Sequence, residues 1–325
     1  MHLNVFNVVL VLTYGTFGWC GTCFNASSVV EVDVLMEHYV FRKVRSPSLY
    51  SCASECLMSS VCMSFNFETR TRICELNSNS SDQVAVTAHP GFLFSDIDHW
   101  PKSLAGACSA TSCGQKACHL DRLGRTACVR EFRGCDEPPT LTNGTRKYDG
   151  VYLGAVTTYT CLPDFLMCRN SSSVCKASRK WSGCVGPCHR YRWDNPDGTR
   201  LTLPCKHVSR FKLSLYITPT AATSITVSVR AHADLLCHYE FRMDVNATVI
   251  NTRVAGAWGA EIRLTHVQLA LGVQSVTEIT LEEGIYRLSV DGKGIYNFTG
   301  RFPDILPQNV KVDGAVLIES AEITL

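Results

Sequence analysis

The sequence predicts a mainly β protein in which small disulfide-rich modules precede a larger β-sandwich of the jelly-roll kind. Of the 18 cysteines in 325 residues, all but Cys188, Cys205 and Cys237 lie before residue 185. Beyond Cys188 the chain shows long stretches in which apolar and polar residues alternate, as they do in strands with one buried face. The length exceeds that of one domain of roughly 100–200 residues, so several domains are expected.

The cysteine content and the N-terminus indicate an exported protein. So many thiols persist as ordered cross-links only in an oxidising compartment. An apolar run at residues 5–12, followed by small residues at 16–18, has the length of a signal peptide over residues 1–18. No later apolar run reaches the ~20 residues of a membrane span. We therefore expect a secreted, extracellular protein without a transmembrane anchor. Acceptor sites for N-glycosylation agree with export and stand at Asn25, Asn79, Asn143, Asn170, Asn246 and Asn297.

Charge and motifs argue against several classes of function. The net charge is only +2 and no basic tract occurs, so nucleic acid is not an expected partner. No histidine pattern of the HxH or HExxH kind is present, and the single CxxC, Cys20 to Cys23, has no second knuckle, so no metal or other cofactor is expected. There is no GxSxG motif either. We expect a protein that is not an enzyme.

Residues 23–104 combine one short helix with a small sheet. Cys52 and Cys56 stand one helical turn apart in a predicted helix over 51–62, and strands are predicted at 63–67 and 72–76. This segment resembles the PAN/apple family in its two-cysteine helix, its Cys-x-Ser-Phe-x-Phe strand and its Cys-Glu-Leu strand. The resemblance implies an adhesion module with the disulfides Cys52–Cys74 and Cys56–Cys62.

Two further cysteine-rich segments follow. Residues 105–134 form a connector with Cys108, Cys113, Cys118 and Cys128, to which no function is assigned. Residues 135–184 resemble the sushi (complement control) family in Cys135, Pro138, Tyr159, Cys161, Cys175, Trp181 and Cys184. That resemblance implies the disulfides Cys135–Cys175 and Cys161–Cys184, with Trp181 as a core aromatic. Cys168 has no place in the pattern and its partner is left open.

Residues 188–325 are predicted to form the sandwich. Cys237 is interpreted as a core thiol or as a partner of Cys205. Strands are expected at 211–218, 224–232, 235–243, 261–264, 275–281, 286–290, 295–298 and 316–323.

A polar and aromatic cluster in this domain has the composition of a sugar site. On a strand, His238, Glu240 and Arg242 point to one face, and Trp258 offers a flat apolar surface for the C–H face of a pyranose. Asn251 follows as a further polar group, and Glu261 and Arg263 are expected to share a face. Two carboxylates facing one site can also serve glycoside hydrolysis, but Glu240 and Glu261 are better explained as partners of the two arginines.

From about residue 212 to 325 the chain resembles the galectins. The residues that carry the resemblance are His238 and Arg242 of a His-x-Asn-x-Arg motif, Asn251, and Trp258, Glu261 and Arg263 of a Trp-Gly-x-Glu-x-Arg motif. Glu240 departs from the family, which has Asn there. The resemblance implies that Trp258 stacks on galactose, that His238 and Arg242 read its axial hydroxyl, and that Asn251 and Glu261 hold its exocyclic hydroxyl with support from Arg263.

The sequence thus predicts a secreted lectin whose partners are glycans or glycoproteins, with β-galactoside-like ligands favoured. The PAN/apple and sushi segments would add contacts to other extracellular proteins. The alternative is an extracellular adhesion or matrix molecule whose galectin-like domain no longer binds galactosides.

Overall fold

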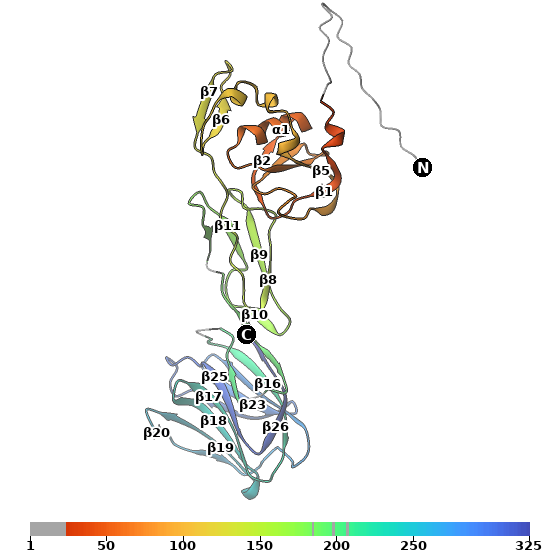
Figure 1. Cartoon of the computed structure of the whole chain (residues 1–325). Coiled ribbons are helices and arrows are strands. Elements are labelled where there is room, and N and C mark those ends of the chain that lie inside the picture. Colours follow the sequence, from red (N-terminus) through yellow and green to blue (C-terminus); the bar gives the residue numbers. More distant parts are fainter. Residues whose placement is uncertain (1–23, 184, 197–198, 206–207) are drawn as a thin grey trace, which may run out of the picture. The chain divides into compact units, whose positions relative to one another are not determined.

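A computed structural model describes residues 24–183, 185–196, 199–205 and 208–325, which divide into two compact units (Figure 1). The first unit holds residues 24–134 and 150–152, and the second holds 135–149 and 153–325. The predicted signal peptide, residues 1–18, the Cys20–Cys23 pair and Cys184 lie outside the described residues. Within the described part, no helix is long and apolar enough to cross a membrane.

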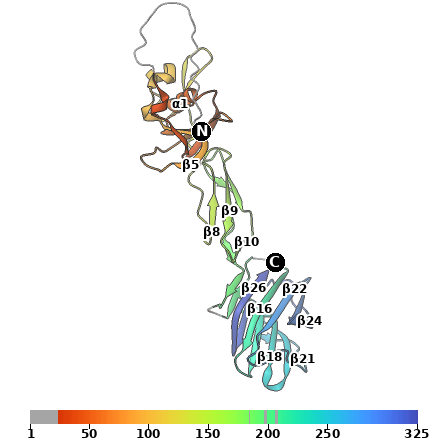
Figure 2. The ribbon, with the colours of Figure 1, turned by 90° about the vertical axis from the view of Figure 1, so that its right-hand side faces the viewer.

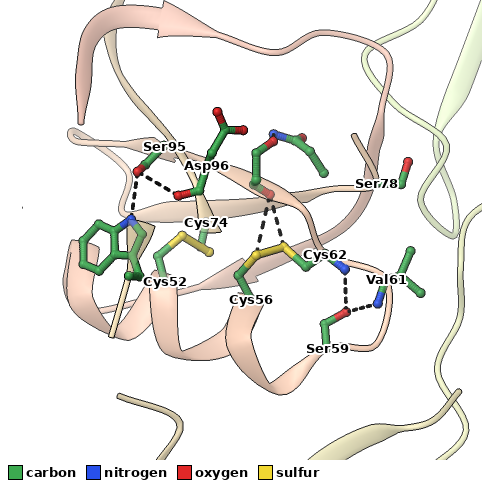
Figure 3. Close-up of a disulfide and its surroundings, with 12 residues drawn as sticks. Cys52, Cys56, Ser59, Val61, Cys62, Cys74, Ser78, Ser95 and Asp96 are labelled. Carbon is green, nitrogen blue, oxygen red and sulfur yellow. Dashed lines mark hydrogen bonds between the residues drawn. A yellow bond between two sulfur atoms is a disulfide. The ribbon is translucent and has the colours of Figure 1, made fainter. Parts of the chain in front are cut away.

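The first unit packs one helix against a five-stranded antiparallel sheet. The sheet order is β1-β5-β3-β4-β2. The helix and the two strands predicted after it are confirmed, although the helix ends at Met58 because Ser59 adopts an extended backbone. The Ser59 hydroxyl then accepts the N–H groups of Val61 and Cys62, each at 3.1 Å (Figure 3). The elements are η1 (Ala26–Ser28), β1 (Glu31–Leu35), β2 (Val40–Arg45), α1 (Leu49–Met58), β3 (Ser64–Glu68), β4 (Ile73–Asn77), β5 (Thr87–Asp96) and η2 (Ile97–His99).

Two disulfides tie α1 to its surroundings. Cys52 bonds Cys74 of β4, and Cys56 bonds Cys62 just beyond the helix, which is the pairing that the PAN/apple resemblance implies (Figure 3). A small core needs such covalent support because it buries little apolar surface.

The connector is stapled by Cys108–Cys118 and Cys113–Cys128. The first joins η3 (Lys102–Ala110) to β6 (Ala117–Leu120), and the second joins the segment between these two elements to β7 (Thr126–Val129), which pairs with β6 in a hairpin.

The second unit begins with the sushi-like segment. Its four-stranded sheet has the order β12-β11-β9-β8, and a separate pair is formed by β10 and β13. The Trp181 ring is partly exposed and packs edge-on against Tyr148, so the expected core position is wrong. The strands are β8 (Gly144–Lys147), β9 (Val156–Cys161), β10 (Phe165–Met167), β11 (Ser172–Cys175), β12 (Trp181–Ser182) and β13 (Cys188–Arg190).

One predicted disulfide of this segment is wrong. Cys135 bonds Cys175, as the sushi resemblance implies, but Cys161 bonds Cys188 and not Cys184. The reason lies in the pairing of β13 with β10, which sets Met167 opposite Cys188 and brings the Cα atoms of Cys161 and Cys188 to 5.6 Å, a normal disulfide separation.

The structure also shows the states of Cys168 and Cys237, whose pairing the sequence left open. Cys168 bonds Cys205, so Cys205 is not available to Cys237. Cys237 is a free thiol buried in the core of the sandwich.

The rest of the second unit is a sandwich of two antiparallel sheets (Figures 1 and 2). One sheet has the order β14-β26-β16-β22-β23-β24, and the other has the order β15-β25-β17-β18-β19-β20, with β21 also paired to β19. The first sheet comprises β14 (Arg192–Asp194), β16 (Phe211–Pro219), β22 (Ser275–Glu282), β23 (Ile285–Val290), β24 (Lys293–Thr299) and β26 (Val316–Thr324). The second comprises β15 (Arg200–Thr202), β17 (Ser224–Ala231), β18 (Asp234–Arg242), β19 (Ala247–Val254), β20 (Ala257–Trp258), β21 (Ile262–Leu264) and β25 (Asn309–Gly314).

Alternation along these strands builds the core and leaves a polar face on the second sheet. Leu213, Leu215 and Ile217 of β16 and Tyr239 and Phe241 of β18 turn inward and are fully buried. The side chains between them on β18 point away from the core, which is the face that carries the predicted site.

The predicted glycosylation acceptors are accessible to solvent. Asn79 is partly exposed, and the other five are exposed: Asn25, Asn143, Asn170, Asn246 and Asn297.

Candidate functional site

A groove of about 800 Å³ lies on the outer face of the second sheet. It gathers all but one of the predicted site residues on β18, β19 and the segment after β19. Side chains from β17 and β25 extend it beyond the predicted set. Its lining includes Ser228 and Arg230 of β17, His238, Glu240 and Arg242 of β18, Asn251 and Arg253 of β19, Trp258, Gly259, Glu261, and Lys311 and Asp313 of β25.

Glu240 and Arg242 form the charged centre of the groove. The Nε and Nη2 atoms of Arg242 both donate to Oε2 of Glu240, at 2.9 and 2.7 Å, and Nη2 lies 3.9 Å from Oε2 of Glu261. The hydrogen bond from Arg242 lowers the pKa of Glu240. Glu240 is therefore ionised at neutral pH and acts only as an acceptor, while Arg242 is held in place between two carboxylates.

His238 is fixed by the strand beside it. Ser228 stands opposite His238 in the β17–β18 ladder, and Nδ1 of the ring shares a 2.8 Å hydrogen bond with the Ser228 hydroxyl. The other ring nitrogen, Nε2, is thereby left as the histidine's polar group for a ligand. The ring also meets Trp258 edge-on, with centroids 5.3 Å apart.

A tight turn presents Trp258 to solvent. Ala255 and Gly256 both have positive φ angles, as a two-residue hairpin turn requires, and they set Trp258 opposite Arg253. The Arg253 guanidinium lies 5.6 Å from the ring centroid. With 52% of its surface exposed, Trp258 has an open apolar face and is not a core residue.

Asn251 is a buried polar member of the groove, at 7% exposure. Its Oδ1 accepts the N–H of Thr252 at 2.8 Å and Nη1 of Arg301 at 3.2 Å. Arg301 follows β24 and was not predicted to belong to the site. The sequence gives no signal for it, because the contact spans 50 positions and Arg301 stands in no recognised motif.

Arg263 does not join the groove, which corrects the predicted site. Glu261 precedes β21 and lines the groove, whereas Arg263 lies within that strand and lines a second pocket with His266 and Lys293. The two side chains were expected to share a face of the sheet, and the strand register agrees, because Arg263 stands opposite Val249 and Val249 stands opposite Glu240. Arg263 lies on that face but outside the lining of the groove.

The burial of His238 predicts a pH dependence of stability. Burial lowers the pKa of His238 from its ordinary value near 6.5, and Arg253 and Arg242 act in the same direction against Glu240 and Asp313. His238 therefore takes up a proton less readily in the folded chain than in the unfolded chain. Its contribution to the free energy of unfolding is complete above pH 6.5, and it is lost as the pH falls through the lowered pKa of the folded state.

We expect the free energy of unfolding, measured by urea titration between pH 7.5 and 5.5, to fall more steeply in the natural protein than in a His238→Gln variant. Equal slopes for the two proteins would contradict this assignment.

Comparison with protein families divides the chain into three matches. Residues 198–323 match the galactoside-binding lectins, residues 24–99 match the PAN domain, and residues 135–188 match the Sushi repeat.

Individual relatives show the same pattern. Galectin-7 of Rattus norvegicus is 32% identical over 105 residues, which cover 29% of this chain and 76% of that protein. Probable galaptin lec-8 of Caenorhabditis elegans is 31% identical over 105 residues, covering 32% of this chain and 58% of its own length. A Rattus norvegicus protein with sushi, von Willebrand factor type A, EGF and pentraxin domains is 34% identical over 62 residues, which are 19% of this chain and 2% of that protein. The chain thus spans less than two thirds of these last two relatives.

Solved structures with a similar fold include Caenorhabditis elegans galectin LEC-6, with 23% identity, a TM-score of 0.39, and coverage of 42% of this chain and 96% of that one. Sheep galectin-11 in complex with glycerol has 18% identity, a TM-score of 0.35, and coverage of 40% and 98%.

Proposed function

Because its C-terminal domain makes this chain a member of the galectin family, we propose that it is a secreted lectin that binds galactose-containing glycans in the groove of the second sheet. The observation that carries the proposal is the exposed face of Trp258 beside the fixed polar groups of His238, Arg242 and Asn251.

The groove supplies both kinds of contact that a pyranose needs. The sugar's C–H face stacks on Trp258, and its hydroxyl rim meets donors and acceptors whose positions are already set. In this proposal His238 and Arg242 read an axial hydroxyl of the sugar, and Asn251 and Glu261 hold its exocyclic hydroxyl. Groups held in place before binding lose little conformational entropy when the ligand docks.

Glu240 changes the hydrogen bonds that the groove offers. An Asn in this place would supply a donor as well as an acceptor, whereas the ionised Glu240 only accepts. A ligand hydroxyl near Glu240 must therefore act as a donor, which selects among galactosides that differ in substitution at that hydroxyl.

Binding without catalysis fits the electrostatics of the groove. A glycosidase keeps one of its two carboxyl groups protonated to act as the general acid. Arg242 donates two hydrogen bonds to Glu240 and lowers the pKa of that carboxyl group, so Glu240 does not supply a protonated general acid.

The PAN and sushi segments are proposed to contact other extracellular proteins or to present the lectin domain. These matches also support the second candidate function, an adhesion or matrix molecule whose groove no longer binds galactosides.

A glycan array probed with the secreted full-length protein separates the two functions. We expect galactose-terminated glycans to bind, and Arg242→Gln to abolish binding because it leaves Glu240 without its partner. Arg287→Gln is the matched control, since Arg287 pairs with Glu282 at 3.1 Å on the other sheet. Absence of binding by a folded, deglycosylated sample would contradict the lectin function and favour the adhesion molecule.

A further inference from the structure

After the turn at 255–256 the chain runs back along β19 as β20 and β21, and this second strand of the hairpin is interrupted at one place. β19 pairs with β20 at Arg253 and Val254, and with β21 at residues 248–250. Between these two ladders, Asn251 and Thr252 lie opposite the segment 259–261, where the backbone bond from the Gly259 N–H to the Thr252 carbonyl joins the two sides. This gap separates Trp258 from Glu261, the two groove residues that the hairpin presents.

The Arg301 guanidinium fills the gap. Nη1 donates to Asn251 Oδ1 at 3.2 Å and to Thr252 Oγ1 at 3.1 Å, and Nη2 donates to the Ala260 carbonyl at 2.5 Å. The same group lies 5.3 Å from the centroid of the Phe298 ring. Within the described residues no carboxylate forms an ion pair with Arg301, so these neutral oxygens are its hydrogen-bond partners.

The lack of a side chain at Gly259 leaves room for this guanidinium. A Cβ at position 259 would stand 2.1 Å from Nη1 of Arg301 and 2.9 Å from Oγ1 of Thr252. Any larger residue would therefore displace the guanidinium, the segment 259–261, or both. The position of the Arg301 guanidinium therefore gives a structural reason for a glycine after Trp258.

Arg301 and the Thr252 N–H together fix which way the Asn251 amide faces. The Thr252 N–H and the Arg301 guanidinium are donors only, so both must face the carbonyl oxygen of the Asn251 side chain. Because Asn251 lines the groove, its Nδ2 group is then the donor that this side chain offers to a ligand, whereas Glu240 offers an acceptor.

We propose that Arg301 is a positioning residue that holds the segment 259–261 and orients the Asn251 amide, and thereby sets the affinity of the groove without touching the sugar. The effect on sugar affinity rests on the proposed lectin function, whereas the effect on the groove itself does not.

Arginine is required because a planar fork reaches three acceptors at once, and lysine cannot reproduce that geometry although it keeps the charge. In Arg301→Lys we expect lactose to bind roughly ten- to a hundredfold more weakly in calorimetric titrations of the full-length protein. Arg287→Lys, which changes an arginine of the other sheet, should bind as the natural protein does. Affinities are compared well below each variant's melting temperature, so that a loss of stability alone does not appear as a loss of binding.

A double-mutant cycle tests whether Arg301 acts through Asn251. If it does, Arg301→Lys costs less affinity in an Asn251→Ala background than in the natural one. Full additivity of the two substitutions would overturn the action through Asn251, and unchanged lactose affinity in Arg301→Lys would overturn the proposal as a whole.

A measurement without ligand distinguishes this proposal from the proposed function. Hydrogen exchange of the amides at 257–261 should accelerate in Arg301→Lys and not in Arg287→Lys. If the natural protein binds no glycan, the lectin function fails while this readout still decides the role of Arg301. Unchanged exchange at 257–261 would overturn that role.

Discussion

Replacing Trp258 by alanine is expected to weaken binding of galactose-terminated glycans roughly thirtyfold or more, a loss of about 2 kcal/mol that is typical of an aromatic anchor. The reason is that Trp258 supplies the exposed aromatic surface of the groove, against which the C–H face of a sugar would pack. The ring also meets His238 edge-on and lies near the Arg253 guanidinium, both of which line the groove on the outer face of the sheet.

The same substitution should hardly alter stability, because the ring is 52% exposed. We expect the melting temperature to change by less than about 2 °C. Tyr216→Ala is the matched control: Tyr216 is 39% exposed on β16 of the other sheet, so its removal should leave sugar binding unchanged. A large drop in the melting temperature of Trp258→Ala would show that the ring supports the fold, and unchanged affinity would remove it from the site.

The second large effect is expected from the Cys135→Ser/Cys175→Ser double variant. The bond closes a span of 40 residues in a segment with few buried apolar side chains, so its loss should destabilise the sushi-like segment by about 4 kcal/mol. That is comparable to the whole stability of a domain this small. Limited proteolysis followed by mass spectrometry should then show cuts within residues 135–183.

The expected cuts have a matched control in Cys113→Ser/Cys128→Ser, which removes a disulfide with a span of 15 residues from the first unit. That variant should leave residues 135–183 resistant to protease. Equal resistance in the Cys135→Ser/Cys175→Ser variant would show that hydrophobic packing alone maintains the segment.

Local patterns in the sequence predicted much of the sandwich. The alternation of β18 is enough to separate His238, Glu240 and Arg242 from the buried Tyr239 and Phe241, because the side-chain period of a strand is two wherever the strand is continuous. The same rule places Arg263 on the outer face of β21, with Ile262 against the core, but it does not show where along that face the groove ends, and Arg263 lies outside its lining.

Contacts between distant parts of the chain could not be predicted from local sequence patterns. The partner of Cys161 depends on how β10 pairs with β13. Cys184 and Cys188 are only four positions apart, so the sequence alone does not show which of them bonds Cys161. Arg301 reaches Asn251 across 50 positions, and Lys311 enters the groove because β25 pairs with β17. Strand order and register are set by the whole fold, so no local window contains them.

The order of the strands has a consequence for biosynthesis. β26 lies between β14 and β16, and β25 lies between β15 and β17, so both sheets remain split until the last of these strands has left the ribosome. The disulfide-bonded segments that precede the sandwich are complete long before that point, and domains nearer the N-terminus fold first during translation. Until β26 is synthesised, β14 and β16 each have an unpaired edge, which can pair with a strand of another chain. The galectin-like domain is therefore the last part of the described chain to complete its fold, and its strands keep unpaired edges until then.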